Sequence, residues 1–136
     1  MKFAIALALF LAAIVYAQQS ASVWDGVYMQ EQASRGKAVY DKNCASCHGK
    51  ALDGVSAPAL TGMEFTGSWD GLTADDLFER IQTAMPADAP GRLSRTQTAD
   101  LVAFLLTFNG FPAGQKELPS DAASLQTIRF EATRHK

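Results

Sequence analysis

Both cysteines of the chain fall in one short segment, Cys44-Ala45-Ser46-Cys47-His48. Two thiols separated by two residues suit three kinds of site: a redox-active disulfide, half of a zinc site, or the attachment point of a haem. A zinc site needs four ligands, and the other histidine of the chain is His135, far along the sequence. A thioredoxin-like disulfide would lie beside a βαβ pattern, whereas the residues that flank this segment indicate helix and loop.

The histidine that directly follows the second cysteine favours haem attachment. The two thiols can add to the two vinyl groups of one haem, and the adjacent imidazole of His48 can then reach the iron. The segment therefore predicts one covalently bound haem c, with its iron, for each chain.

The first residues of the chain indicate export. Lys2 precedes a continuous apolar run from Phe3 to Val15, and we expect a signal peptide over residues 1–17, cleaved between Ala17 and Gln18. The alternative is an uncleaved anchor, but the run is short for a membrane span, which needs about 20 apolar residues. We therefore expect a periplasmic protein with no stable membrane insertion after cleavage.

Length and composition indicate one soluble domain over residues 18–136. The chain has 136 residues, of which 48% are hydrophobic and 19% are charged. Its formal charge is −2, and removal of Lys2 leaves 11 basic against 14 acidic side chains. The chain has no excess of basic side chains that would attract nucleic acid, so we expect no nucleic-acid partner.

Three helices are expected to position the cysteine segment and bury the haem. The first spans residues 30–43 and leads into the cysteines, with Gly36 and Tyr40 on one face. The second spans residues 73–84, where Thr73 can cap the first turn, and it ends before Met85-Pro86. The third starts at Ser94 with capping-box spacing and ends at Asn109 with a broad apolar stripe.

Two segments lack a helical pattern. Residues 49–71 are rich in Gly, Ser, Pro and Thr, and this composition predicts a long structured loop. Residues from about 115 to 136 are polar with scattered apolar positions. We expect them to form a C-terminal tail that packs on the domain or trails from it.

The chain resembles the class I c-type cytochromes across nearly all of residues 18–136, and particularly bacterial members. The matching motifs are Cys44-Ala45-Ser46-Cys47-His48-Gly49, Ala57-Pro58-Ala59-Leu60, Met85-Pro86, Val23-Trp24-Asp25-Gly26-Val27-Tyr28 and Asn109-Gly110-Phe111-Pro112. The resemblance implies an all-α, small class I cytochrome c fold, in which three main helices wrap round one covalent haem c. One departure is Met29, where such relatives often have a helix-capping threonine.

The resemblance also implies roles for particular residues. Cys44 and Cys47 would form the thioethers, and His48 would be the proximal ligand of the iron. The other ring nitrogen of His48 should donate a hydrogen bond to the carbonyl of Pro58, which would fix the ring and raise its basicity. Taken without the resemblance, Pro58 is equally well explained as a loop former.

The distal iron ligand is expected to be Met85, because it follows the end of a helix on a loop that can cross the haem face. Met63, in the predicted loop, is the alternative, and Met29 is better explained as a packing residue. Ligation by a methionine sulfur raises the reduction potential of a haem.

Further haem contacts are expected from Leu60, Phe65, Trp69 and Phe104, although ordinary core packing explains the same residues. The indole N–H of Trp69 and the guanidinium of Arg92 could reach a haem propionate. For Arg92 the alternative is a solvated loop charge.

With both axial positions filled, the protein is expected to be an electron carrier and not an enzyme. It would shuttle single electrons in a periplasmic redox or respiratory chain and dock transiently, as a monomer, on redox-partner proteins. One alternative is a cytochrome subunit of a larger oxidoreductase, such as a quinoprotein dehydrogenase. Another is an open-site haem that supports peroxidase chemistry or gas binding, which would require Met85 to be off the iron.

Overall fold

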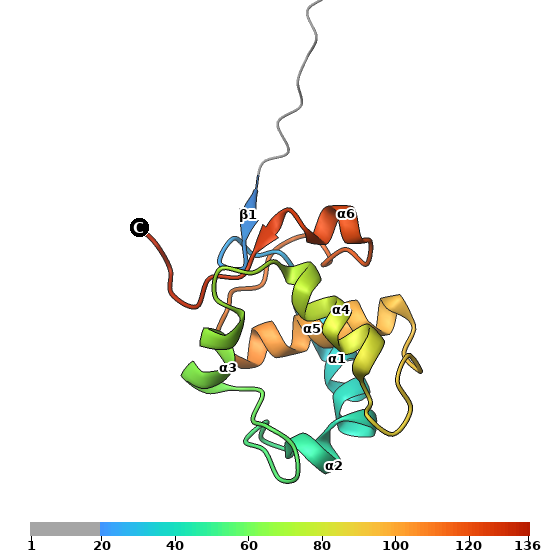
Figure 1. Ribbon diagram of the computed structural model, residues 1–136. Helices are drawn as coiled ribbons and strands as arrows, with labels where there is room; N and C mark the ends of the chain where they lie inside the picture. Colours follow the sequence, from blue (N-terminus) through green and yellow to red (C-terminus); the bar gives the residue numbers. More distant parts are fainter. Residues whose placement is uncertain (1–19) are drawn as a thin grey trace, which may run out of the picture.

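The computed structural model describes residues 20–136, and the predicted signal peptide lies outside these residues. Nearly all of the regular secondary structure in the described part is helical (Figure 1), as expected for the all-α class. The elements are β1 (Ala21–Ser22), α1 (Gln30–Asn43), α2 (Ala45–His48), α3 (Gly62–Trp69), α4 (Ala74–Ala84), α5 (Arg95–Phe108), α6 (Ala122–Leu125) and β2 (Ile128–Arg129). None of the helices in residues 20–136 has the length and apolar character of a membrane span.

The three predicted helices are present as α1, α4 and α5, and α1 crosses α5 at close range (Figure 1). Gly36 makes this crossing possible, because a Cβ at this position would lie 1.8 Å from the carbonyl oxygen of Asp100. One turn further along α1, the ring of Tyr40 packs on Phe104 with 5.3 Å between the ring centroids. The crossing fixes the direction in which α1 delivers the chain to the cysteines.

Side-chain caps start α4 and α5 where the sequence predicts them. Thr73 and Asp76 form a reciprocal capping box at α4, and Ser94 and Gln97 form one at α5. The start of α1 is different, since Met29 occupies the capping position and makes no side-chain cap hydrogen bond. The helix then depends on its packing against α5 rather than on its own cap.

The prediction of a continuous loop over residues 49–71 is wrong, because α3 forms within it. Phe65 and Trp69 are four residues apart and therefore lie on one face of a helix, and that face packs against the core. The hydroxyls of Thr66 and Ser68 donate to the carbonyls four residues earlier in α3. Serine, threonine and glycine are weak helix formers, so tertiary packing of the two aromatic rings decides this segment.

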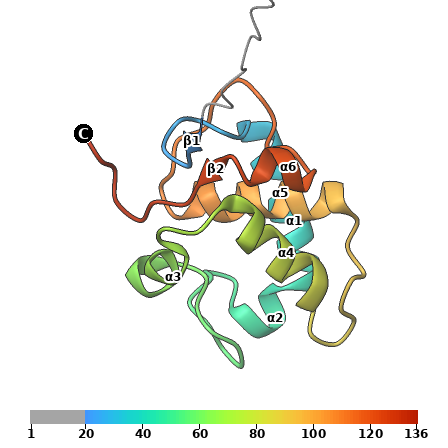
Figure 2. The ribbon, with the colours of Figure 1, turned by 45° about the horizontal axis from the view of Figure 1, so that its top comes forward.

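The C-terminal segment packs on the domain. Leu118, Leu125, Ile128 and Phe130 are buried, and β2 pairs in parallel with β1. The amide of Gln32 in α1 both donates to the carbonyl of Leu118 and accepts from its N–H, at 3.0 and 2.7 Å. Figure 2 shows this segment at the end of the domain opposite α2, so it stabilises the helices without covering the cysteines.

Candidate functional site

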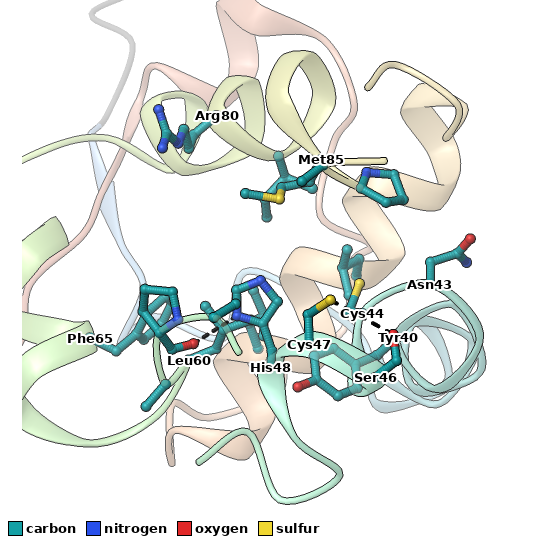
Figure 3. A pocket seen from close by; sticks show the side chains of 18 of the residues that line it. Tyr40, Asn43, Cys44, Ser46, Cys47, His48, Leu60, Phe65, Arg80 and Met85 are labelled. Atoms are coloured by element: carbon teal, nitrogen blue, oxygen red, sulfur yellow. Dashed lines mark hydrogen bonds between the residues drawn. The ribbon is translucent and has the colours of Figure 1, made fainter. Parts of the chain in front are cut away.

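The cysteine segment folds as one short helical turn, α2, directly after α1. Its main chain is anchored by the N–H of Cys44, which donates to the carbonyl of Tyr40 at 2.8 Å. Cys44 is half-buried and Cys47 is exposed, and both are free thiols. Figure 3 shows the two sulfur atoms on one side of a cavity. Burial raises the pKa of the Cys44 thiol to about 11, which outweighs the opposing effect of the nearby Arg92 charge.

The imidazole of His48 is held by one strong hydrogen bond. Its Nδ1 lies 2.7 Å from the carbonyl oxygen of Pro58, which can only accept, so Nδ1 must carry the proton. This is the hydrogen bond that the resemblance implies. With Nδ1 engaged as a donor, Nε2 is the ring nitrogen left available as a metal ligand, and Figure 3 shows the ring pointing into the cavity toward Met85.

The loop that presents Pro58 is itself fixed to the cysteine segment. The backbone N–H groups of residues 55–57 all lie 3.1 Å from the carbonyl oxygen of Cys47, and the hydroxyl of Tyr40 donates to the carbonyl of Gly49 at 2.7 Å. Gly49 has a positive φ of 87°, and a Cβ there would lie 2.3 Å from the carboxylate of Asp53. Glycine is therefore required where the chain turns out of α2.

Met85 lies across the cavity from His48 (Figure 3). It directly follows α4, and its N–H donates to the carbonyl of Ile81 at 3.0 Å, which fixes its main chain to the last turn of the helix. Met63, the alternative ligand, is 90% exposed and does not line the cavity. Met29, at the start of α1, does not line the cavity either. Among the methionines in residues 20–136, the geometry thus favours Met85.

The cavity has a volume of about 710 Å³, which is within the size range of cofactor sites. One wall is α2 with the loop after it, and the opposite wall is α4 with the loop that contains Pro86. Its apolar lining comes from residues that contact or belong to the core: Leu60, Phe65, Trp69, Leu77, Ile81, Leu101 and Leu105. Two thiols, one imidazole nitrogen and one thioether face a mostly apolar space, and this donor set fits a haem attached through its vinyl groups.

The structure brings most of the expected contact residues together. Leu60, Phe65 and Trp69 line the cavity. Arg92 also lines it, but its guanidinium donates at 3.1 Å to Asn43, which lies on the side of the cysteines. Phe104 is not among the lining residues, because its ring packs on Tyr40 within the α1–α5 crossing.

Several lining residues were not singled out from the sequence. Leu77 and Ile81 project from α4, while Leu101 and Leu105 project from α5, each pair with the i, i+4 spacing of one helix face. The apolar stripes of these helices were visible in the sequence. Which part of each stripe faces the cavity is decided by how the helices pack. Arg80 was also missed, and it lines the cavity from α4.

Comparison with known proteins gives three similarities. The family described as "Cytochrome C oxidase, cbb3-type, subunit III" matches residues 31–105, more than half of the chain. Cytochrome c-551 from Bacillus subtilis (strain 168) is 34% identical over 61 residues, which cover 45% of this chain and 53% of that protein. The chain thus spans about half the length of that relative. The sulfane dehydrogenase SoxCD from Paracoccus pantotrophus is 26% identical with a TM-score of 0.47, over 65% of this chain and 53% of that one.

Proposed function

The chain belongs to this family of c-type cytochromes, described as subunit III of cbb3-type oxidase, and on that premise we propose that it carries single electrons on one haem c. The haem would be bound covalently through Cys44 and Cys47, and the mature protein would work in the periplasm. The observation that carries the proposal is the cavity in which His48 and Met85 face each other beside the two thiols.

Each residue of the cavity has a definite task in this proposal. Nε2 of His48 and the sulfur of Met85 would be the ligands that the chain offers to the iron. A haem held there would supply a centre that can alternate between the ferric and ferrous states. The carbonyl of Pro58 keeps the proton of His48 on Nδ1, which fixes the ring and makes it a better ligand. The apolar walls from α4 and α5 exclude water, so a change of charge needs little reorganisation of solvent.

The same arrangement argues for a carrier and against an enzyme. With His48 and Met85 both on the iron, no axial position is left for a substrate. No histidine besides His48 lines the cavity in residues 20–136, and His135 is exposed in the C-terminal segment. Peroxidase chemistry would need an open position on the iron.

The axial assignment is tested by two matched substitutions. Met85→Ala should lower the reduction potential, abolish the sulfur-to-iron charge-transfer band and allow carbon monoxide or cyanide to bind. Met63→Ala should leave the spectrum nearly intact, because this side chain is in solvent. If Met63→Ala alone lowered the reduction potential and allowed carbon monoxide or cyanide to bind, the iron ligand would be Met63 and not Met85. A Met85→Ala protein with the wild-type spectrum would remove the basis for a closed-site carrier.

Covalent attachment and export are tested by mass. The mature protein should have the mass of residues 18–136 plus one haem, and acid–acetone extraction should leave the haem on the denatured chain, because thioether bonds survive loss of the fold. Haem that is extracted by this treatment would contradict attachment through the cysteines. A mass that includes residues 1–17 would contradict cleavage after Ala17.

We expect redox-partner proteins to dock where the cavity opens beside the cysteines. Ser46, Cys47 and Ala87 are exposed there, and Lys42 and Arg92 are the nearby cations. The formal charge of the chain is only −2, so long-range steering should be weak and the contact small. Because the matching family is named for an oxidase subunit, stable assembly into a larger oxidoreductase is the second candidate. The native mass in extracts separates the two, since a free carrier elutes as a monomer.

A further inference from the structure

Arg80 is a cation at the edge of the cavity with no partner in the described chain. It projects from α4, is exposed and lines the cavity. Within residues 20–136 its guanidinium makes no ion pair and no hydrogen bond. Other arginines of the fold are engaged, since Arg35 pairs with Asp100, Arg95 with Glu79 and Arg92 with Asn43.

The position of Arg80 relative to the cysteines indicates what it could bind. Figure 3 places Arg80 and Phe65 on one side of the cavity and Cys44, Cys47 and Asn43 on the other. In a haem, the two vinyl groups and the two propionates occupy opposite halves of the porphyrin ring. If the vinyl groups are bonded to the cysteines, the propionates must therefore point toward α3 and the nearby part of α4.

We propose that Arg80 is the ion-pair partner of a haem propionate, a role that the sequence had suggested for Arg92. This inference rests on the proposed function, because it requires a haem attached through Cys44 and Cys47. The planar guanidinium can donate two parallel hydrogen bonds to one carboxylate. Trp69, on the facing helix α3, also lines the cavity, and its indole N–H can donate to the same propionate or to the other one.

The other polar side chains near Arg80 at this edge of the cavity offer no positive charge to a propionate. Glu64 of α3 lines the cavity and carries a negative charge that would repel a propionate. The hydroxyl of Ser68 is already used within α3, where it donates to the carbonyl of Glu64 at 2.7 Å. Arg92 is held by Asn43 on the far side of the cavity. Arg80 is thus the cation that the described chain places beside the expected position of the propionates.

The test compares the haem-loaded wild type with Arg80→Gln, Arg80→Lys and the matched control Arg92→Gln. The first readout is the propionate-bending band of the resonance Raman spectrum, which responds to hydrogen bonds at the propionates. The second is the midpoint potential at one fixed pH and ionic strength. Arg80→Gln should shift the band and lower the potential, because a nearby cation favours the reduced haem. Arg80→Lys should keep much of the potential while still shifting the band, since an ammonium group cannot make the two-pronged contact.

Arg92→Gln should leave the band of the wild type unchanged. If Arg92→Gln shifted the propionate-bending band and Arg80→Gln left it unchanged, the proposal would be overturned and Arg92 would be the partner of the propionate. A band that is unchanged in all three variants would also overturn it. The haem content and the sulfur-to-iron band are recorded for every protein, so a failure of the proposed function appears as loss of these signals in the wild type. With both signals intact, a silent Arg80→Gln refutes the Arg80 assignment alone.

Discussion

Adding a single methyl group at Gly36 tests the contact that organises the fold. Gly36 lies in α1 where this helix crosses α5. A Cβ at this position would lie 1.8 Å from the carbonyl oxygen of Asp100, 2.5 Å from its carbonyl carbon and 2.9 Å from the Cβ of Phe104. The first two atoms belong to the main chain of α5, which cannot rotate out of the way as a side chain can. Gly36→Ala therefore forces the two helices apart.

Two opposing effects set the change in the free energy of unfolding that Gly36→Ala causes. Alanine is favoured over glycine within a helix by about 0.5–1 kcal/mol. Overpacking of a close-packed interior typically costs about 1–3 kcal/mol, and here the contact is with rigid main chain. Separation of the helices would also disturb the ion pair of Arg35 with the buried Asp100, now at 3.0 Å. We expect a net loss of about 2 kcal/mol for alanine, and more for valine, from a total stability of about 5–15 kcal/mol.

The assay is chemical denaturation of the haem-loaded protein, with the free energy of unfolding taken from the midpoint and the slope. Gly67→Ala in α3 is the matched control, because a Cβ there would meet no atom within 4 Å. It should leave the stability unchanged or raise it by up to about 1 kcal/mol through helix propensity. If Gly36→Ala were as stable as wild type, α1 and α5 would not approach as closely as the structure shows.

Three further predictions concern buried or titrating groups. Burial raises the pKa of Tyr40 to about 12, so its stabilising effect is present below pH 10 and lost as the pH rises toward 12. Tyr40→Phe should lower the free energy of unfolding by about 1 kcal/mol at neutral pH, because a hydrogen bond is lost. This difference from wild type should disappear when denaturation is measured as the pH rises toward 12. Hydrogen bonds from the N–H and hydroxyl of Thr73 lower the pKa of Asp76, whose stabilisation is present above about pH 4 and lost as the pH falls through its folded pKa. Between pH 7 and pH 3, Asp76→Asn should therefore lose less stability than wild type, and equal losses would contradict the capping role. Gln32→Leu leaves the N–H and carbonyl of Leu118 without partners and should cost about 2 kcal/mol or more. It should also speed limited proteolysis of the C-terminal segment, and unchanged cleavage would show that other contacts hold that segment.

Local signals in the sequence were sufficient for the main helices. The capping residues Thr73 and Ser94 define where α4 and α5 begin, because a cap is satisfied within one turn and needs no distant partner. The spacing of Cys44, Cys47 and His48 indicated the cofactor for the same reason, since all the reacting groups lie within five residues. Such features are read without knowledge of the rest of the chain.

Features that depend on distant segments could not be read in this way. Helix α3 forms in a segment of weak helix formers, because Phe65 and Trp69 pack on a core built by other helices. Phe104 and Leu105 are adjacent on one apolar helix, yet the packing of α1 places Phe104 against Tyr40 and leaves Leu105 to line the cavity. The periodicity of a helix shows that it has an apolar face but not which partner each residue meets.

The sequence by itself determined the kind of chemistry and the helices that frame it, because these follow from residue types a few positions apart. The tertiary structure alone decided which arginine lies across the cavity from the cysteines. Met85 already differs from Met63 in the sequence, because it stands between a helix end and Pro86, but no local pattern distinguishes Arg80 from Arg92. The packing of the helices does so, since it brings Arg80 of α4 to the side of the cavity away from the cysteines, while Arg92 is held by Asn43 beside them.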